Sequence, residues 1–349
     1  MANSQTSTLP TFAISIQPKF KVARRLQRKW ERFMLIPNLV ANYAYDFNRF
    51  LKWSSMMGKV TTKTQLQALI TMDYHRVEKG LALKEPRLRF GPQVIERLLS
   101  NVRKYHQNYG PDETTQVAIN ALFSYYTFNL ESGIEDEQLH QSLNALKQLN
   151  DHPNCSTADG GTVAVTKQQI FDASHLDLSN FFASRYSIRQ FTSEDVATEL
   201  IERAVVMAQK TPSVCNRQSS KVYVFSKAED KQKVLSYQNG NRGFGDQASK
   251  VLIVTSNLEH FVSAGERNQC WVDGGMFSMS LVYALHSLGL GTCCLNWSVE
   301  RQADQELRQV AGISDAEAVM MMIAVGHLPE TLKVAQSPRK PLRDVLVLK

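Results

Sequence analysis

Apolar and polar positions follow two different rhythms along the chain, and the change falls near residue 170. Before it, apolar residues recur every three or four positions, as in 92–110 and 136–150, which is the spacing of amphipathic helices. After it, short β-branched runs such as 221–226 and 250–256 alternate with helical segments such as 197–210. We therefore predict an α+β fold, with a central β-sheet flanked by helices in the second half and a mainly α-helical N-terminal region before it.

A largely apolar segment, 274–290, predicts a helix at the centre of the second half. The runs 291–297 and 319–327 predict two more strands. The most apolar stretch of the chain, 276–297, is interrupted by serines, glycines and His286. We interpret it as a buried helix that leads into a strand, not as a membrane span.

The stretch 150–169 separates the two halves and is rich in Asn, Asp, Ser, Thr, Pro and Gly, which are typical of linkers. We expect a helical N-terminal region of unknown function over 1–165 and a second domain over 170–349. No repeat with a period of about 20 to 50 residues is present, so a solenoid is not expected.

A basic segment near the N-terminus, 19–34, has the spacing of an amphipathic helix. Val22, Leu26, Trp30 and Phe33 form its apolar stripe. Charged outer faces are common on soluble helices, so we expect this stripe to pack into its own domain. Peripheral contact with a membrane surface through 19–34 is the less favoured alternative. The cations of the segment are Lys19, Lys21, Arg24, Arg25, Arg28, Lys29 and Arg32.

Residues 72–91 begin as a helix that Gly80 can end, before a proline-containing connection. His75 and Glu78 are spaced i, i+3 and share a face of that helix. A metal site needs more ligands than such a pair supplies. We interpret the pair as a structural hydrogen bond or ion pair and predict no metal site.

The composition indicates the cellular compartment of the protein and the class of partner that it binds. Of 349 residues, 43% are hydrophobic and 21% are charged, as in ordinary globular proteins. The formal charge of +7 and the pI of about 9.1 favour anionic partners such as phosphates and nucleotides, although no nucleic acid is expected. The five cysteines form no CxxC pair, and the first residues do not resemble a secretory signal, so the reducing cytoplasm is the expected compartment.

Four short segments of the second half carry residues that suit a phosphorylated aromatic ring. A phosphate is bound by fixed guanidinium groups and hydroxyls, which Arg185, Ser187 and Arg339 can supply. A planar heteroaromatic ring is bound by amide side chains and close backbone approach, which Asn216, Gln218, Gly289 and Gly291 can supply. The segments are SRYSIRQF (184–191), TPSVCNRQSS (211–220), GLGTCCLN (289–296) and SPRKPLRDVL (337–346).

In their order and spacing these segments resemble the nitroreductase family of FMN-dependent oxidoreductases. An R-x-S-x-R-x-F opening is followed by an apolar helix, P-S-x-x-N-x-Q, a core helix that ends in G-L-G-T, a strand that ends in G-H and a late R-K-P-L. The resemblance covers about residues 180–349. It implies a nitroreductase-like central β-sheet and a homodimer with FMN at its interface.

The resemblance implies two groups of cofactor-binding residues. On the phosphate side, Arg185 and Ser187 would hold the FMN phosphate with Arg339, and Arg189 would lie near the flavin pyrimidine. On the ring side, residues 212–216 would approach from the partner subunit. The implied set is Arg185, Tyr186, Ser187, Arg189, Pro212, Ser213, Asn216, Gln218, Asn241, Gly291, Leu295, Asn296, Arg339 and Lys340.

Within this set, Asn241 would contact the ring, and Leu295 and Asn296 would lie over it near N5. Tyr186, Asn296 and the pair Ser219-Ser220 depart from the residues common in the family, which leaves the substrate preference open.

The activity implied is transfer of a hydride from NAD(P)H, through flavin N5, to a small oxidised acceptor such as a nitroaromatic or a quinone, by a ping-pong mechanism. The flavin carries the chemistry, so no catalytic side chain is assigned. Relatives of this fold also oxidise azolines or remove halogens reductively, and these reactions stay open. A further alternative is a dimer scaffold without reductase activity, whose basic N-terminal half binds a membrane surface, an acidic polymer or a protein partner.

Overall fold

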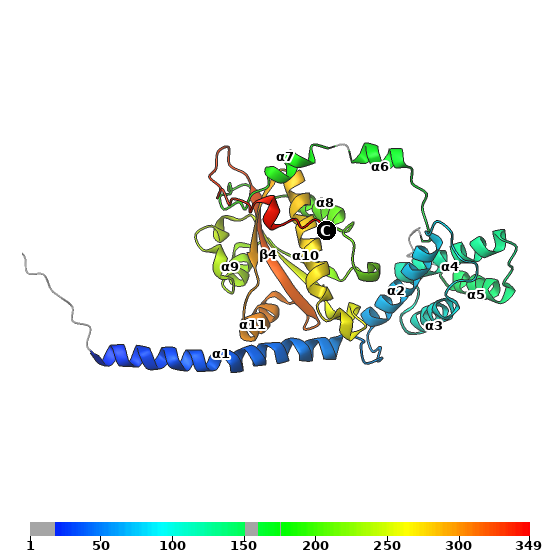
Figure 1. Ribbon diagram of the computed structural model, residues 1–349, viewed down its shortest axis with the longest axis horizontal. Coiled ribbons are helices and arrows are strands. Elements are labelled where there is room, and N and C mark those ends of the chain that lie inside the picture. The colour runs from blue at the N-terminus through cyan, green and yellow to red at the C-terminus, as the bar shows by residue number, and fades with distance from the viewer. Residues whose placement is uncertain (1–17, 151–159, 175) are drawn as a thin grey trace, which may run out of the picture. The chain divides into compact units, whose positions relative to one another are not determined.

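The computed structural model describes residues 18–150, 160–174 and 176–349, and the chain divides into two compact units, 1–48 and 49–349. The described part of the first unit belongs to helix α1 (Pro18–Trp53), which continues well beyond residue 34 and contains Pro37 (Figure 1). Trp30 and Phe33 are exposed, with ring centroids 6.0 Å apart. This unit therefore offers the apolar stripe no second described element to pack against. Of the predicted cations in the basic segment, all but Lys29 have side chains outside the described part.

Four helices of the second unit form a bundle, as expected for a mainly helical N-terminal region. They are α2 (Lys63–Leu81), α3 (Pro92–Tyr109), α4 (Glu113–Glu131) and α5 (Glu137–Asn150). Their apolar faces share one core, in which Leu66, Ile70, Leu98, Val102, Ile119, Leu122 and Leu143 are almost fully buried. The bundle thus has a hydrophobic centre of its own.

Local sequence explains where these helices begin and end. Thr62 and Gln65 form a capping box at the start of α2, and the Asp112 side chain accepts from two main-chain N–H groups at the start of α4. Helix α2 does not end at Gly80 but continues to Leu81. A side chain at Gly80 would collide with the Phe90 ring, so this glycine allows close packing inside the helix.

The pair on α2 has the expected structural geometry: His75 Nδ1 lies 3.3 Å from Glu78 Oε2. The other Glu78 carboxylate oxygen accepts from the Gly161 main chain at 3.3 Å, which ties the connecting segment to α2. The described residues contain no cluster of potential metal ligands.

The connecting segment contains two short helices, α6 (Lys167–Ala173) and α7 (Leu178–Ala183). Residues 151–159 of the predicted linker, with Cys155, lie outside the described residues. The boundary between the regions 1–165 and 170–349 stays a prediction.

The second half contains a four-stranded sheet with strand order β1-β2-β4-β3, antiparallel throughout. Each of the four predicted strands is confirmed to within two residues at either end. The strands are β1 (Ser220–Phe225), β2 (Lys250–Asn257), β3 (Leu290–Asn296) and β4 (Glu317–His327). The edge strand β3 also forms one parallel bridge, between Thr292 and Ser187.

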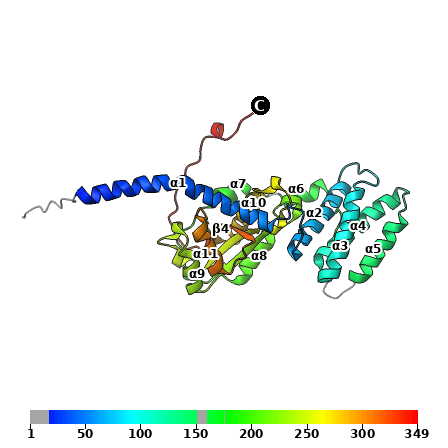
Figure 2. The same ribbon diagram turned by 90° about the horizontal axis from the view of Figure 1, so that it is seen from below.

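Helices cover both faces of this sheet, which confirms the predicted layer arrangement. Leu252 and Val254 of β2 face the core formed with α8 (Thr198–Ala208) and α10 (Gln269–Ser287). Val251 and Ile253 face the opposite core, formed with α9 (Ala228–Leu235) and α11 (Arg301–Ala311). Figure 2 shows α9 and α11 on one side of β4 and α8 on the other.

Short 3₁₀ turns lie between and after these elements and carry two of the predicted site residues, Asn216 and Asn241. They are η1 (Val214–Asn216), η2 (Asn239–Asn241), η3 (Gly245–Gln247), η4 (Leu258–His260), η5 (Ala264–Glu266) and η6 (Leu342–Asp344). No helix in the described ranges is long and apolar enough to cross a membrane. The cysteines of the described part are free thiols.

Candidate functional site

The segment 185–189 lies against the edge of the sheet. The Ile188 N–H donates to the Thr292 carbonyl at 2.8 Å, and the Ile188 side chain is buried. Gly291 permits this approach, because a Cβ there would lie 3.0 Å from Ile188 Cγ2 and 2.9 Å from Leu328 Cδ2. The segment is thus fixed by one inward residue, with its polar residues on either side of it.

Those polar residues and the C-terminal segment line one cavity of about 420 Å³. It contains Arg185, Tyr186, Ser187 and Arg189 from the first segment, together with residues 335–339 from the second. Two predicted phosphate ligands that are 154 positions apart in sequence, Arg185 and Arg339, are therefore brought to the same cavity. Lys340 follows directly but does not line it.

The arginines of this cavity lack carboxylate partners among the described residues. Arg189 donates to the Ser187 carbonyl at 3.4 Å and lies over the Phe244 ring at 5.8 Å, and Arg339 donates to the Ser337 carbonyl at 2.9 Å. Guanidinium groups that converge without counter-charges form a binding site for anions, and phosphate is a favoured one.

The charges of the cavity arginines shift the pKa values of neighbouring titratable groups. Burial lowers the pKa of His286, and the charge of Arg185 lowers it further. Burial raises the pKa of the Cys293 thiol, while Arg189 opposes that rise. His286 Nε2 lies 2.9 Å from the Oγ atom of Ser184, the residue before Arg185, so the imidazole contacts the start of the segment.

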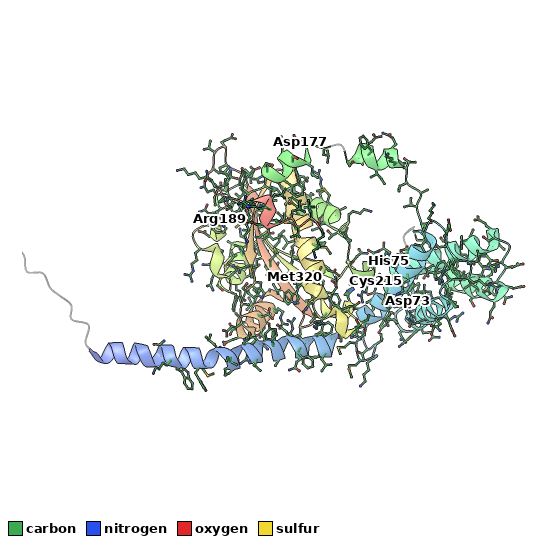
Figure 3. The ribbon with its side chains drawn as sticks, in the orientation of Figure 1. Asp73, His75, Asp177, Arg189, Cys215 and Met320 are labelled. Atoms are coloured by element: carbon green, nitrogen blue, oxygen red, sulfur yellow. The ribbon has the colours of Figure 1, made fainter. Side chains whose placement is uncertain are left out.

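The predicted ring-side residues lie elsewhere on the chain. Pro212, Ser213 and Gln218 line a separate small cavity of about 80 Å³. Figure 3 shows Arg189 and Cys215, which belong to the two segments, well separated in the same chain. A single chain therefore does not bring the two groups together.

The side chains of Asn241 and Asn296 donate hydrogen bonds to residues close to them in sequence. The Asn241 amide donates to the carbonyls of Leu235 and Gln238, and its side chain lines a different hollow beside α9. Asn296 is exposed and donates to Ser298 Oγ at 3.0 Å. The amide of Gln238, which the sequence analysis did not single out, connects the two by donating to the Asn296 carbonyl at 3.1 Å.

Leu295 requires a correction to the expected placement. Its side chain is only 3% exposed and packs in the core between the sheet and α11, so it does not lie over a ligand. Alternation along β3 explains this, because Cys293 and Leu295 point inward while Cys294 and Asn296 point outward. Only the main chain of Leu295 is available to a bound molecule.

Backbone strain marks the same segments. Among the described residues, five that are not glycine have positive φ, and four of these lie in the candidate segments: Cys215, Asn216, Gln218 and Ser337. Left-handed conformations of such residues are rare, and they concentrate at binding and active sites. Ser337 lies in the arginine-lined cavity and was not predicted from the sequence.

Comparison with known proteins identifies this part of the chain. Residues 182–237 and 228–327 match the model of the nitroreductase family. The resemblance that the motifs suggested is thus confirmed in the C-terminal half, where residues 182–327 match the nitroreductase family. The match includes the predicted residues from Arg185 to Asn296 but ends before Arg339 and Lys340. No curated protein matches the chain in sequence.

Solved structures of nitroreductase-like proteins align with about half of the chain. A putative nitroreductase from Desulfovibrio desulfuricans in complex with FMN is 21% identical and covers 50% of this chain and 98% of its own, with a TM-score of 0.43. A nitroreductase family protein from Streptococcus pneumoniae TIGR4 is 18% identical and covers 50% and 100%, with a TM-score of 0.44. The hypothetical oxidoreductase YcnD from Bacillus subtilis is 24% identical and covers 49% and 73%, with a TM-score of 0.43.

Proposed function

We propose that the protein is an FMN-dependent oxidoreductase that takes electrons from NAD(P)H and reduces a small oxidised acceptor, such as a nitroaromatic or a quinone. We further propose that it works in the cytoplasm as a homodimer. One observation carries the proposal: three arginines, none with a carboxylate partner in the described part of the chain, line one cavity inside and beside the region that matches the nitroreductase family.

The cavity suits the phosphate of FMN. Arg185 and Arg339 supply guanidinium donors from two directions, and Ser187 supplies a hydroxyl. Its volume of about 420 Å³ falls in the range of about 300–1,000 Å³ typical of small-molecule sites. Arg189, further along the segment, is in a position to favour negative charge on the pyrimidine edge of the ring.

The second subunit would complete the site. Asn216 and Gln218 belong to a loop that lies away from the arginine cavity of the same chain. In a two-fold dimer each chain gives one group of residues to each of two equivalent sites. The partner's loop would then place its amides at the polar rim of the ring.

Bound FMN would supply the two-electron chemistry, while the protein binds, orients and electrostatically tunes it. The residues of this chain therefore act as ligands and donors. This division of roles agrees with the cavity's lining, in which arginines, serines, a tyrosine and a glutamine accompany apolar residues and no Asp, Glu, His or Lys is present.

Spectroscopy of the purified protein tests the reductase directly. We expect a flavin absorption band that NADPH or NADH bleaches in the absence of oxygen and that a quinone restores. Protein that stays colourless with added FMN would contradict cofactor binding. Protein that binds FMN but resists reduction by both nicotinamides would support a scaffold instead.

Complementation tests the shared site. Co-expressed Arg185→Ala and Asn216→Ala chains should form mixed dimers in which one site is intact and the other carries both changes. With random pairing about a quarter of all sites would be intact, whereas each variant alone has none. The measurement is the fraction of tightly bound FMN per chain. If the fraction of tightly bound FMN in the mixture is no higher than in either variant alone, the whole site lies within one chain.

A further inference from the structure

The loop between α8 and β1 is strained at three positions. Cys215, Asn216 and Gln218 have φ values of 49°, 53° and 50°, and none of them is glycine. A side chain with a Cβ rarely adopts this region, so surrounding contacts must hold the loop in place. Arg217, between two of these residues, has an ordinary φ of −76°.

Arg217 is the inward anchor of this loop. Its side chain is 1% exposed, whereas Gln218 beside it is exposed and Asn216 is partly exposed. The guanidinium forms a fork with the Glu266 carboxylate, with N–O distances of 2.6 and 3.2 Å. Its Nε donates to the Val214 carbonyl at 3.2 Å, which closes the loop on itself.

The partners of Arg217 are themselves fixed. The Val262 N–H donates to Glu266 Oε2 at 2.7 Å, and the Arg217 guanidinium lies 5.6 Å from the centre of the Phe261 ring. A guanidinium held by a two-point carboxylate contact and an aromatic face has little freedom to rotate. Arg217 therefore acts as a rigid clamp.

A second buried carboxylate holds the start of the loop. Asp273 of α10 is 3% exposed, and its Oδ2 accepts from the Val214 N–H at 3.1 Å. Its other oxygen accepts from Gln269 at 2.8 Å. Within the loop, the Gln218 N–H donates to Ser213 Oγ at 2.9 Å. The start of the strained stretch is thus anchored to α10, and its end is held by Ser213 within the loop.

We propose that Arg217, acting through Glu266, is a positioning residue that holds Asn216 and Gln218 in left-handed conformations so that their amides face the flavin of the partner subunit. This inference rests on the proposed function, because it names FMN as the molecule that the amides contact. Arg217 itself points away from the ligand, into the core.

A coupling experiment separates positioning from general stabilisation. Arg217→Lys keeps the charge but loses the fork and the contact with Val214. We expect it to weaken FMN binding about tenfold, because hydrogen bonds from charged groups are lost. The same change is then made in a background with Asn216→Gly and Gln218→Gly, which has neither the amides nor the strained side chains. There we expect Arg217→Lys to change the FMN Kd by less than about twofold.

The apo melting temperature provides the second readout. Arg217→Lys should lower it by a similar amount in both backgrounds, because the lost ion pair is the same. Arg308→Lys is the matched control: Arg308 is also a buried arginine, paired with Asp304 and Asp315. That control should lower the melting temperature and leave the FMN Kd unchanged.

The outcomes are distinct. An equal loss of FMN affinity in both backgrounds, or no loss in the wild-type background, would overturn the positioning role and leave the proposed function standing. A wild-type protein that binds no FMN would overturn both. If Arg217→Lys fails to fold, Glu266→Gln replaces it, with an expected weakening of about threefold in the wild-type background only.

Discussion

The helical bundle and the arginine cavity of the sheet domain differ in how their charged groups are paired. In the bundle, the fully buried Asp73 accepts from Arg97 at 2.6 and 2.7 Å and from Arg76 at 3.2 Å, so its charge is balanced internally. In the sheet domain, Arg185 and Arg339 line a cavity without carboxylate partners among the described residues. Buried charge is costly unless it is paired. The bundle's buried charge therefore stabilises its own fold, whereas the cavity arginines keep donors available, as the proposed phosphate site requires.

The bundle and the sheet domain also differ in the number of residues with strained backbone conformations. The bundle region contains Arg89 as its one described non-glycine residue with positive φ, whereas the loops of the sheet domain contain four. Arg89 is explained by its neighbours, because its N–H donates to Asn129 Oδ1 at 2.8 Å next to the buried Phe90–Tyr125 contact. The strain in the sheet domain instead coincides with the candidate site.

The largest expected effect tests whether the two regions are energetically separate. Leu122→Ala removes a fully buried side chain from the bundle core and should lower the free energy of unfolding by about 2–5 kcal/mol. Below the melting temperature, the FMN Kd should stay unchanged. Leu281→Ala is the matched truncation in the sheet domain and should lower both stability and FMN affinity. Equal losses of FMN affinity would show that the regions act as one body. Denaturant unfolding and flavin titration give the two quantities.

His260 of the sheet domain should give a distinct pH effect on stability. Burial lowers the pKa of His260 from 6.5 to about 4. The unfolded chain therefore binds a proton more readily, and stability falls as the pH drops from 6.5 towards 4. The loss is about 1.4 kcal/mol per pH unit, reaching about 3 kcal/mol.

His260→Gln should remove this part of the acid sensitivity. Burial also lowers the pKa of His106 and His286, so the wild-type curve contains their contributions and the variant isolates the share of His260. Denaturant unfolding between pH 7 and pH 4 measures it. Parallel curves for the two proteins would contradict the assignment.

Arg185→Ala, in the C-terminal half, should weaken FMN binding, whereas a change in the N-terminal half should not. Hydrogen bonds to charged groups are worth about 1.5–3 kcal/mol, so the FMN Kd should rise by about ten- to a hundredfold. Lys29→Ala, in the exposed part of α1, is the control and should leave it unchanged. Fluorescence titration with FMN measures both, and equal affinities would remove Arg185 from the phosphate site.

Gly291→Ala should give the smallest effect. The added methyl group would lie 2.9–3.0 Å from the side chains of Leu328 and Ile188, and Leu328 is exposed enough to move. We expect about 1 kcal/mol of destabilisation, at the low end for overpacking. A modest rise in the FMN Kd should accompany it, because Ile188 fixes the arginine segment. An unchanged melting temperature and Kd would show that this edge is loosely packed.

Sequence predicted the architecture of the second half well, for a physical reason. Short β-branched runs and one-faced helices follow from local periodicity, so β2 and α8 appear near their predicted bounds. The convergence of Arg185 and Arg339 on one cavity was anticipated from motif order alone. Their role as phosphate ligands stays a prediction until the titration is done.

Other features depend on tertiary contacts that local sequence does not encode. An arginine in a loop is usually exposed, and only the fold places Glu266 beside Arg217 across 49 positions. The family resemblance implied that Leu295 lies over the ring, but strand alternation turns its side chain inward. In α1, the helix continues through Pro37, which local propensity alone would not favour.

The single parallel bridge between Ser187 and Thr292 has a consequence for the dynamics of the sheet. Because the segment that lines the arginine cavity also shields the outer edge of β3, an anion held by those arginines would slow the opening of that edge. Ligand occupancy and protection of the Ile188 amide from solvent exchange should therefore rise together, which makes the rim of the sheet a reporter of whether its cavity is filled.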